Sequence, residues 1–147
     1  MKLLIADDNG AFRNGLSRVL ALQGHTVLEA SDGLIASELA FEQYPDVILC
    51  DFVMPRMNGL TLYLLLRKNS QTRHIPFILM TGSTRMEELQ SWQMEALTEV
   101  ILLPKPFDFD QLFAVLARFS PINVDDPMLF QSRSQEAVDE LPLKDHE

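Results

Sequence analysis

Residues 46–59 read DVILCDFVMPRMNG, and this segment organises the rest of the chain. The run from Val47 to Cys50 is uncharged, which is typical of a short strand buried on both faces. It ends at the carboxylate of Asp51, after which Pro55 and Gly59 predict a loop. An unpaired buried charge is costly, and ligands bind at the carboxyl ends of strands in open α/β sheets. We therefore interpret Asp51 as a candidate reactive carboxylate.

Short apolar runs on both sides of this segment alternate with helix patterns. The other runs that predict strands are Lys2–Ala6, Thr26–Ala30, Ile75–Met80 and Val100–Leu103. The predicted helices run from Phe12 to about Gln23-Gly24, from Ser31-Asp32-Gly33 to Pro45, from Gly59 to Arg67, from Thr84 to Glu95, and from a cap at Asp108 to about Phe119. Five βα units with continuous apolar strands predict an α/β fold with a parallel sheet, right-handed crossovers and helices on both faces.

Composition predicts a single domain with an acidic extension. The chain has 147 residues, 47% of them apolar, which suffices for one full core. Residues 1–119 contain 14 acidic and 10 Lys or Arg side chains, whereas residues 120–147 contain 7 and 2. We therefore expect a domain over 1–119 and an acidic tail over 120–147, flexible or docked on the body. The net charge of −9 and the absence of a basic helix in the tail argue against direct binding to nucleic acid.

Several classes of protein are excluded or disfavoured by missing patterns. The single cysteine, Cys50, excludes a disulfide within the chain and suits a reducing cytosol; its strand position favours core packing. No run approaches 18 apolar residues and no signal sequence precedes the first strand, so we expect a soluble, cytoplasmic protein without membrane insertion. Neither GxGxxG nor GKS or GKT occurs, which weighs against nucleotide binding. His25, His74 and His146 show no metal-binding spacing.

Polar groups of complementary chemistry follow four of the five predicted strands. Asp7-Asp8 follow the first strand, Asp51 the third, Thr81 the fourth and Lys105 the fifth. In a parallel sheet these ends lie at one edge and can converge. Neighbouring carboxylates repel one another and raise the pKa of one of them, a conflict that a divalent cation removes. A few hard oxygen ligands suit Mg²⁺, and an ammonium and a hydroxyl are what a phosphoryl group needs on its remaining oxygens.

Each of these groups also has an ordinary structural interpretation. Asp7-Asp8 fit a solvated turn with a helix cap, Asp51 alone fits a loop cap, and Thr81 fits a helix start. Lys105, between two prolines, fits an exposed loop lysine. Their joint occurrence at four strand ends favours a common site over four unrelated features.

Over residues 1–119 the sequence resembles the receiver domain of two-component response regulators. The matching elements are Asp7-Asp8, Asp51, the loop Met54-Pro55…Met57-Asn58-Gly59, Thr81, and Lys105-Pro106-Phe107. The resemblance implies a doubly wound, flavodoxin-like fold with a five-stranded parallel sheet of order 2-1-3-4-5. It also implies a single-domain switch similar to the chemotaxis regulators.

The resemblance further assigns a role to each site residue. Asp51 would accept a phosphoryl group from a histidine kinase or histidine phosphotransfer protein. Asp8 and Asp51 would bind Mg²⁺ together with the backbone carbonyl of Val53, and Asp7 would act mainly through a water.

Two further residues would respond to the phosphoryl group. Lys105 would pair with Asp51 at rest and with the phosphoryl group afterwards, and its bond to Pro106 is usually cis in the family. Thr81 would turn inward and pass the signal to a downstream protein target. Phosphoryl transfer needs mostly positioning and charge neutralisation, so the chain would not be an enzyme beyond its own phosphorylation and slow self-dephosphorylation.

The chain departs from the family pattern near the fifth strand. Leu102 stands where receiver domains commonly carry Tyr or Phe, so the usual coupling of an aromatic switch to Thr81 is in doubt. The small-residue segment that usually precedes this strand is replaced by Leu97-Thr98-Glu99. The apolar run Leu102-Leu103-Pro104 predicts a partner or dimer surface around Leu102, or a face buried against the tail.

Two alternative functions follow from the same residues. The first is a pseudo-receiver, a constitutive interaction module that no longer takes phosphate, which the Leu102 departure favours and the intact acidic set disfavours. The second is a Mg²⁺-dependent phosphohydrolase, which would need a second acid two residues after Asp51, where Val53 stands. Val53, with Ser83 two residues after Thr81, flanks the expected path of the attacking water. Since Val cannot orient water, we predict slow self-dephosphorylation.

Overall fold

The computed structural model describes residues 1–82 and 99–120. Strands and helices alternate along them: β1 Lys2–Ala6, α1 Gly10–Leu22, β2 Thr26–Ala30, α2 Gly33–Gln43, β3 Val47–Asp51, α3 Gly59–Arg67, β4 Phe77–Gly82, β5 Val100–Lys105 and α5 Phe109–Ala117. The helix predicted over Thr84–Glu95 and residues 121–147 of the tail predicted over 120–147 lie outside the described residues. Within these residues, no helix is long and apolar enough to cross a membrane.

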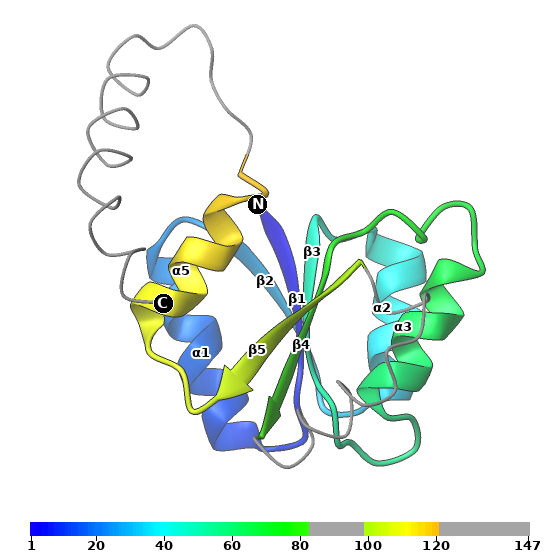
Figure 1. Cartoon of the computed structure of the whole chain (residues 1–147), viewed down its shortest axis with the longest axis horizontal. Coiled ribbons are helices and arrows are strands. Elements are labelled where there is room, and N and C mark those ends of the chain that lie inside the picture. The colour runs from blue at the N-terminus through cyan, green and yellow to red at the C-terminus, as the bar shows by residue number, and fades with distance from the viewer. Residues whose placement is uncertain (83–98, 121–147) are drawn as a thin grey trace, which may run out of the picture.

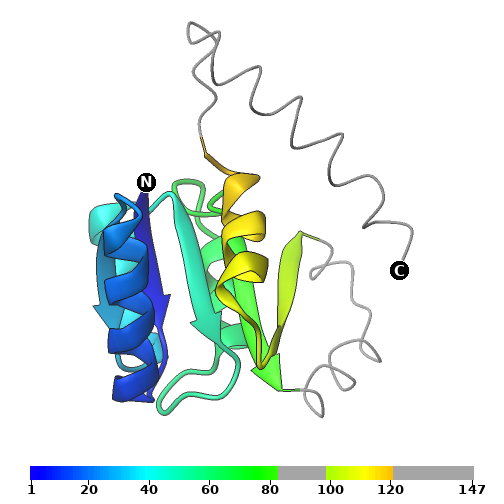
Figure 2. The ribbon, with the colours of Figure 1, turned by 90° about the vertical axis from the view of Figure 1, so that its left-hand side faces the viewer.

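The strands form one parallel sheet in the order β2-β1-β3-β4-β5, as predicted. Helices α1 and α5 cover one face of the sheet and α2 and α3 the other (Figure 1). Turning the molecule by 90° brings α1 and α5 in front of the strands (Figure 2). Strand β3 is central, because it pairs with β1 on one side and β4 on the other.

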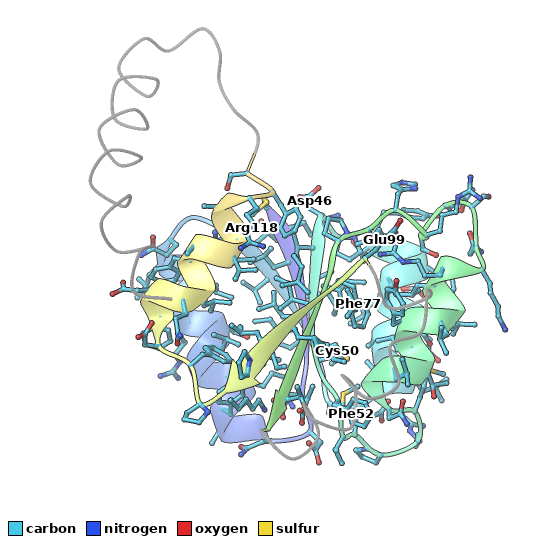
Figure 3. The ribbon with its side chains drawn as sticks, viewed as in Figure 1. Asp46, Cys50, Phe52, Phe77, Glu99 and Arg118 are labelled. Atoms are coloured by element: carbon cyan, nitrogen blue, oxygen red, sulfur yellow. The ribbon has the colours of Figure 1, made fainter. Side chains whose placement is uncertain are left out.

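Each face of the sheet carries its own apolar core, which explains why the strands are continuously apolar. Towards α2 and α3 lie Leu4, Ile48, Cys50, Phe77 and Leu79; towards α1 and α5 lie Leu3, Ile5, Leu49, Ile78 and Met80. The labelled Cys50 and Phe77 point to the α2–α3 side (Figure 3). Successive strand residues therefore alternate between two buried faces. The predicted burial of Cys50 is confirmed.

Helix starts follow the capping residues in the sequence. Asn9, Asp32, Asn58 and Asp108 each accept a hydrogen bond from a backbone N–H of the first turn of their helix. At Asp108 the cap is a full capping box, because the Gln111 side chain accepts from the Asp108 backbone N–H. The predicted cap at Asp108 is therefore confirmed.

The strand boundaries differ from the prediction at four positions. Strand β4 ends at Gly82 and not at Met80, so Thr81 lies within it. Strand β4 begins at Phe77 and not at Ile75, because Pro76 has no N–H to donate. Strands β3 and β5 run on to Asp51 and Lys105, so these polar groups are the last residues of strands.

The predicted apolar surface on β5 needs a correction. Leu103 is a core residue that packs with the α1–α5 side, because it points towards α5. Leu102 points the other way and is half-buried against the α2–α3 core, and Pro104 is exposed. A partner surface around Leu102 stays a prediction, without Leu103.

Candidate functional site

Three carboxylates meet at the carboxyl edge of the sheet. Strand β1 ends just before Asp7 and Asp8, and its neighbour β3 ends at Asp51. One carboxylate oxygen from each of the three lies within 4.8 Å of the other two. Asp7 is buried, Asp51 is half-buried and Asp8 is exposed, so the cluster opens to solvent on one side. The structure thus brings these three predicted residues together.

Lys105, at the end of β5, reaches across β4 to this cluster. Its Nζ donates to Asp7 Oδ2 at 3.0 Å and lies 3.5 Å from Asp51 Oδ1. The pair with Asp51 that the resemblance implies is present, and the shorter contact is to Asp7. The Lys105-Pro106 peptide bond is cis, as the resemblance also implies. Lys105 therefore bridges the acids of β1 and β3.

Both carboxylate oxygens of the buried Asp7 accept hydrogen bonds, and so does its backbone carbonyl oxygen. The Asn9 backbone N–H donates to Asp7 Oδ1 at 2.9 Å, opposite the Lys105 contact. Arg13 Nη1 donates to the Asp7 carbonyl oxygen at 2.6 Å, and its Nε pairs with Glu29 at 3.0 Å. Sequence reasoning missed the roles of Asn9 and Arg13, since nothing in their local pattern distinguishes them from an ordinary cap and an ordinary helix arginine.

The side chain of Lys105 also contacts an aromatic ring. Its Nζ lies 4.4 Å from the centroid of the Phe12 ring, a cation–π contact, and Phe107 packs edge-on to that ring at 6.1 Å. The sequence predicts Phe12 only as the first residue of a helix and gives no sign of this contact. The ring limits where the ammonium can lie, because a displaced ammonium would lose this contact.

Burial raises the pKa of the Asp51 carboxyl. The neighbouring Lys105 ammonium opposes this effect, and the negative charges of Asp7 and Asp8 add to it. A cation among the three carboxylates would remove the repulsion. The donor set fits Mg²⁺, because three hard carboxylate oxygens on a side open to solvent leave room for the waters that Mg²⁺ retains.

Thr81 lies on β4, beside β3, and is buried. Its hydroxyl donates to the Gly82 carbonyl oxygen at 3.3 Å, and among the described residues it makes no hydrogen bond to the acidic cluster. Val53, two residues after Asp51, is 51% exposed. Ser83 lies outside the described residues. In this structure Thr81 is thus near the site without binding to it.

The backbone behind Asp51 explains the glycine of the loop motif. A Cβ on Gly59 would lie 2.5 Å from the Asp51 carbonyl oxygen and 2.7 Å from Leu79 Cδ1. The Gly59 N–H also donates to the Phe52 carbonyl oxygen at 2.8 Å. Helix α3 can begin so close to β3 only because residue 59 has no side chain.

The loop between β3 and α3 contacts the start of α2. Arg56 Nη2 lies 2.6 Å from Asp32 Oδ2, and Asp32 is a buried helix cap. The backbone N–H of Ile35 lowers the pKa of Asp32, and Arg56 lowers it further. Sequence reasoning missed this pair, because its members lie in separate βα units.

Comparisons with known proteins agree with this architecture. The sequence model of the response regulator receiver domain family matches residues 3–117. The DNA-binding dual master transcriptional regulator RpaA of Synechocystis sp. is 31% identical over 114 residues, which cover 77% of this chain and 46% of RpaA. The chain spans about half the length of the curated relatives that it matches.

Solved receiver structures share the fold. Chemotaxis response regulator CheY4 of Vibrio cholerae is 32% identical, with a TM-score of 0.72 over 81% of this chain and 98% of CheY4. The receiver domain of sensor histidine kinase PA1611 of Pseudomonas aeruginosa, solved with a magnesium ion in its active-site cleft, is 25% identical. Its TM-score is 0.70, over 80% of this chain and 95% of that domain. With its family match, its sheet order and its acidic cluster, this chain belongs to the family of response regulator receiver domains.

Proposed function

We propose that this protein is a phosphorylation-dependent signalling switch that accepts a phosphoryl group on Asp51 with Mg²⁺ and signals by protein contact. One observation carries the proposal: the carboxylate oxygens of Asp7, Asp8 and Asp51 lie within 4.8 Å of one another, and Lys105 contacts two of these acids. Such a set supplies metal ligands, a nucleophile and a counter-charge at one edge of the sheet. The magnesium ion in the similar PA1611 receiver domain supports the metal assignment.

The proposed donor is a phosphohistidine on a histidine kinase or histidine phosphotransfer protein. A carboxylate oxygen of Asp51 attacks the phosphorus atom, so that an O–P bond forms as the N–P bond breaks. The electron pair of the broken bond goes to the imidazole, and an acyl phosphate remains on Asp51. Mg²⁺ bound by Asp8, Asp51 and the Val53 carbonyl would neutralise charge on the transferring group.

The chain's own residues hold the nucleophile in place. Lys105 is 3.5 Å from Asp51 Oδ1 before transfer and can then pair with a phosphoryl oxygen. Its second contact, at 3.0 Å to Asp7, together with the Phe12 ring, keeps the ammonium at the site. We assign Asp7 a contribution through a water, since its two oxygens already bind Asn9 and Lys105.

The proposed output is a contact with a downstream protein after Thr81 turns towards the phosphoryl group. The half-buried Leu102 replaces the usual aromatic partner of this change, so the output surface would lie around Leu102 and Pro104 without a swinging ring. We propose no direct nucleic-acid contact for these 147 residues, given the net charge of −9. We also propose that the protein is cytoplasmic and that it catalyses no reaction beyond the phosphorylation and slow dephosphorylation of its own Asp51.

Intact-mass measurement tests the proposal. The full chain is incubated with Mg²⁺ and a small phosphodonor or beryllium fluoride, and we expect one added group. Asp51→Asn and chelation of Mg²⁺ should each abolish the mass shift. Asp46→Asn is the matched control, because Asp46 is exposed just before the amino end of β3, at the opposite edge of the sheet. No incorporation by the wild type would contradict the proposal and favour the pseudo-receiver.

A further inference from the structure

The loop that follows Asp51 is fixed at its base by backbone hydrogen bonds. The Phe52 N–H donates to the Met80 carbonyl oxygen at 3.0 Å, and the Gly59 N–H donates to the Phe52 carbonyl oxygen at 2.8 Å. Between these points the chain turns back on itself, and Arg56 has a φ of 66°, in the left-handed region. Residues other than Gly and Asn rarely adopt this backbone conformation, so another interaction must offset its energetic cost.

A backbone hydrogen bond from the Met57 N–H to the Pro55 carbonyl oxygen, at 2.7 Å, spans this residue, and the side chain of Arg56 adds a second interaction. Its Nε and Nη2 both donate to Asp32 Oδ2, at 2.9 and 2.6 Å. The other oxygen, Asp32 Oδ1, accepts from the Ile35 N–H at 2.9 Å, and Asp32 is only 7% exposed. The acceptor is therefore fixed to the start of α2, and Arg56 attaches the loop to this fixed point.

The loop backbone touches α2 at the next residue. A Cβ on Gly33 would lie 2.1 Å from the Met57 carbonyl oxygen, so the two backbones are in direct contact. Arg56 through its side chain and Met57 through its backbone thus meet the first turn of α2. The Arg56 side chain is 55% exposed and the Asp32 side chain 10%, so solvent screens the pair on the Arg56 side and limits its contribution to stability. The pair therefore has more effect on the path of the loop than on the free energy of folding.

We propose that Arg56 is a positioning residue for the phosphoacceptor site, and that its attachment to Asp32 sets the direction of the Val53 carbonyl. The inference rests on the proposed function, in which this carbonyl is a Mg²⁺ ligand. Val53 lies between the fixed Phe52 and the attached Arg56, so the Arg56 contact restricts its peptide plane. Mg²⁺ demands near-ideal octahedral geometry, and a misdirected ligand lowers its affinity.

The direction in which one substitution changes Mg²⁺ affinity separates a positioning role from a purely electrostatic one. Arg56→Gly removes a positive charge near a cation site, which by Coulomb's law should tighten Mg²⁺ binding. Loss of positioning should weaken it. Gly also accepts the left-handed backbone without cost, so the substitution removes the side-chain contact without straining the turn.

Calorimetric titration of Mg²⁺ into the full chain measures this effect. We expect Arg56→Gly to weaken Mg²⁺ binding about tenfold, the lower end of what loss of an outer-shell partner costs. Asp32→Asn should weaken binding similarly, and the double variant should be no weaker than Arg56→Gly, because both substitutions remove one contact. Arg73→Gly is the matched control, since Arg73 is exposed ahead of β4, at the opposite edge of the sheet.

Urea unfolding without metal is the second measurement. A positioning role predicts that Arg56→Gly keeps nearly the wild-type stability while Mg²⁺ affinity falls. Arg56→Lys retains the charge without the pair of hydrogen bonds to Asp32, and it should weaken Mg²⁺ binding as well. Wild-type affinity in Arg56→Gly, or tighter binding, would overturn the positioning role and leave the proposed function intact. A wild type that binds neither Mg²⁺ nor beryllium fluoride would overturn both.

Discussion

Asp51→Asn should make the metal-free protein more stable at neutral pH. The reason is that Asp51 is held, half-buried, among like charges. Its nearest favourable contact is Lys105 at 3.5 Å, and oxygens of Asp7 and Asp8 lie within 4.8 Å. Burial and these acids raise the pKa of Asp51 above its usual value. The ionised carboxylate therefore works against folding, and an uncharged amide of the same shape removes that penalty.

The size of the effect follows from these distances. At an effective dielectric constant of about 20, the attraction to Lys105 at 3.5 Å is about 5 kcal/mol. Under the same assumption, each carboxylate repulsion at 4.8 Å is about 3.5 kcal/mol. Solvent screens the exposed Asp8, so the attraction and the repulsions nearly cancel. Burial of the ionised carboxylate, the largest cause of its raised pKa, then leaves a net penalty of about 1 kcal/mol. For a domain of this size, that corresponds to a rise in melting temperature of roughly 3–5 °C.

Thermal unfolding followed by circular dichroism, with a chelator and then with Mg²⁺, checks this expectation. With chelator at pH 7.5, Asp51→Asn should melt above the wild type. A raised carboxyl pKa means that the folded state binds more protons, so wild-type stability falls as pH rises from the usual Asp pKa through the raised one. The difference between the two proteins should therefore shrink in acid. At Mg²⁺ concentrations about a hundred times the dissociation constant, the wild type should gain about 2.7 kcal/mol and Asp51→Asn much less.

A matched substitution and two outcomes make this test decisive. Asp46→Asn changes the same chemical group at the opposite edge of the sheet, so it should leave the Mg²⁺ gain unchanged. If Asp51→Asn lowers the metal-free melting temperature, the argument from burial and repulsion is wrong. If Mg²⁺ stabilises Asp51→Asn as much as the wild type, Asp51 is not a ligand.

Three further substitutions, the first with a matched comparison, give separate expectations. Gly59→Ala places a Cβ 2.5 Å from the Asp51 carbonyl oxygen and should cost about 1–3 kcal/mol in urea unfolding, whereas Gly15→Ala, with nothing within 4 Å, should stabilise α1 by about 0.5–1 kcal/mol. Val53→Asn should shorten the acyl-phosphate lifetime several-fold by orienting water, and an unchanged lifetime by intact mass would contradict this. The Ile35 N–H lowers the pKa of Asp32 from 3.8, so the stabilisation from this carboxylate is present above about pH 4 and is lost in stronger acid. In that acidic range the stability of Asp32→Asn should therefore depend less on pH than that of the wild type.

The fold was largely predictable because both faces of each inner strand are covered. Continuous apolar runs such as Leu3–Ala6 and Val47–Cys50 arise only when helices pack on both sides, which makes the sheet parallel and the units βα. Start signals at Asp32, Asn58 and Asp108 are local, since a cap bonds to its own first turn. The misplaced features were Pro76, which delays β4, and Leu103, whose facing depends on where α5 packs.

The local sequence determines which chemical groups stand at the strand ends. The sequence directly shows a strand that stops at Asp51, a pair of acids after β1 and a lysine at the end of β5, because each follows an apolar run. Their expected chemistry, oxygen ligands and a counter-charge for a phosphoryl group, depends only on residue type and order.

Which groups touch depends on the order β2-β1-β3-β4-β5, because it makes β1 and β3 neighbours although β2 lies between them in the sequence. Asp7 and Lys105, 98 residues apart, become hydrogen-bond partners in this way, and the Phe12 ring comes to lie against the same ammonium. The attachment of Arg56 to Asp32 likewise requires α2 and the β3–α3 loop to pack together. Local patterns cannot encode such pairings, since their free energies arise only after distant elements have packed.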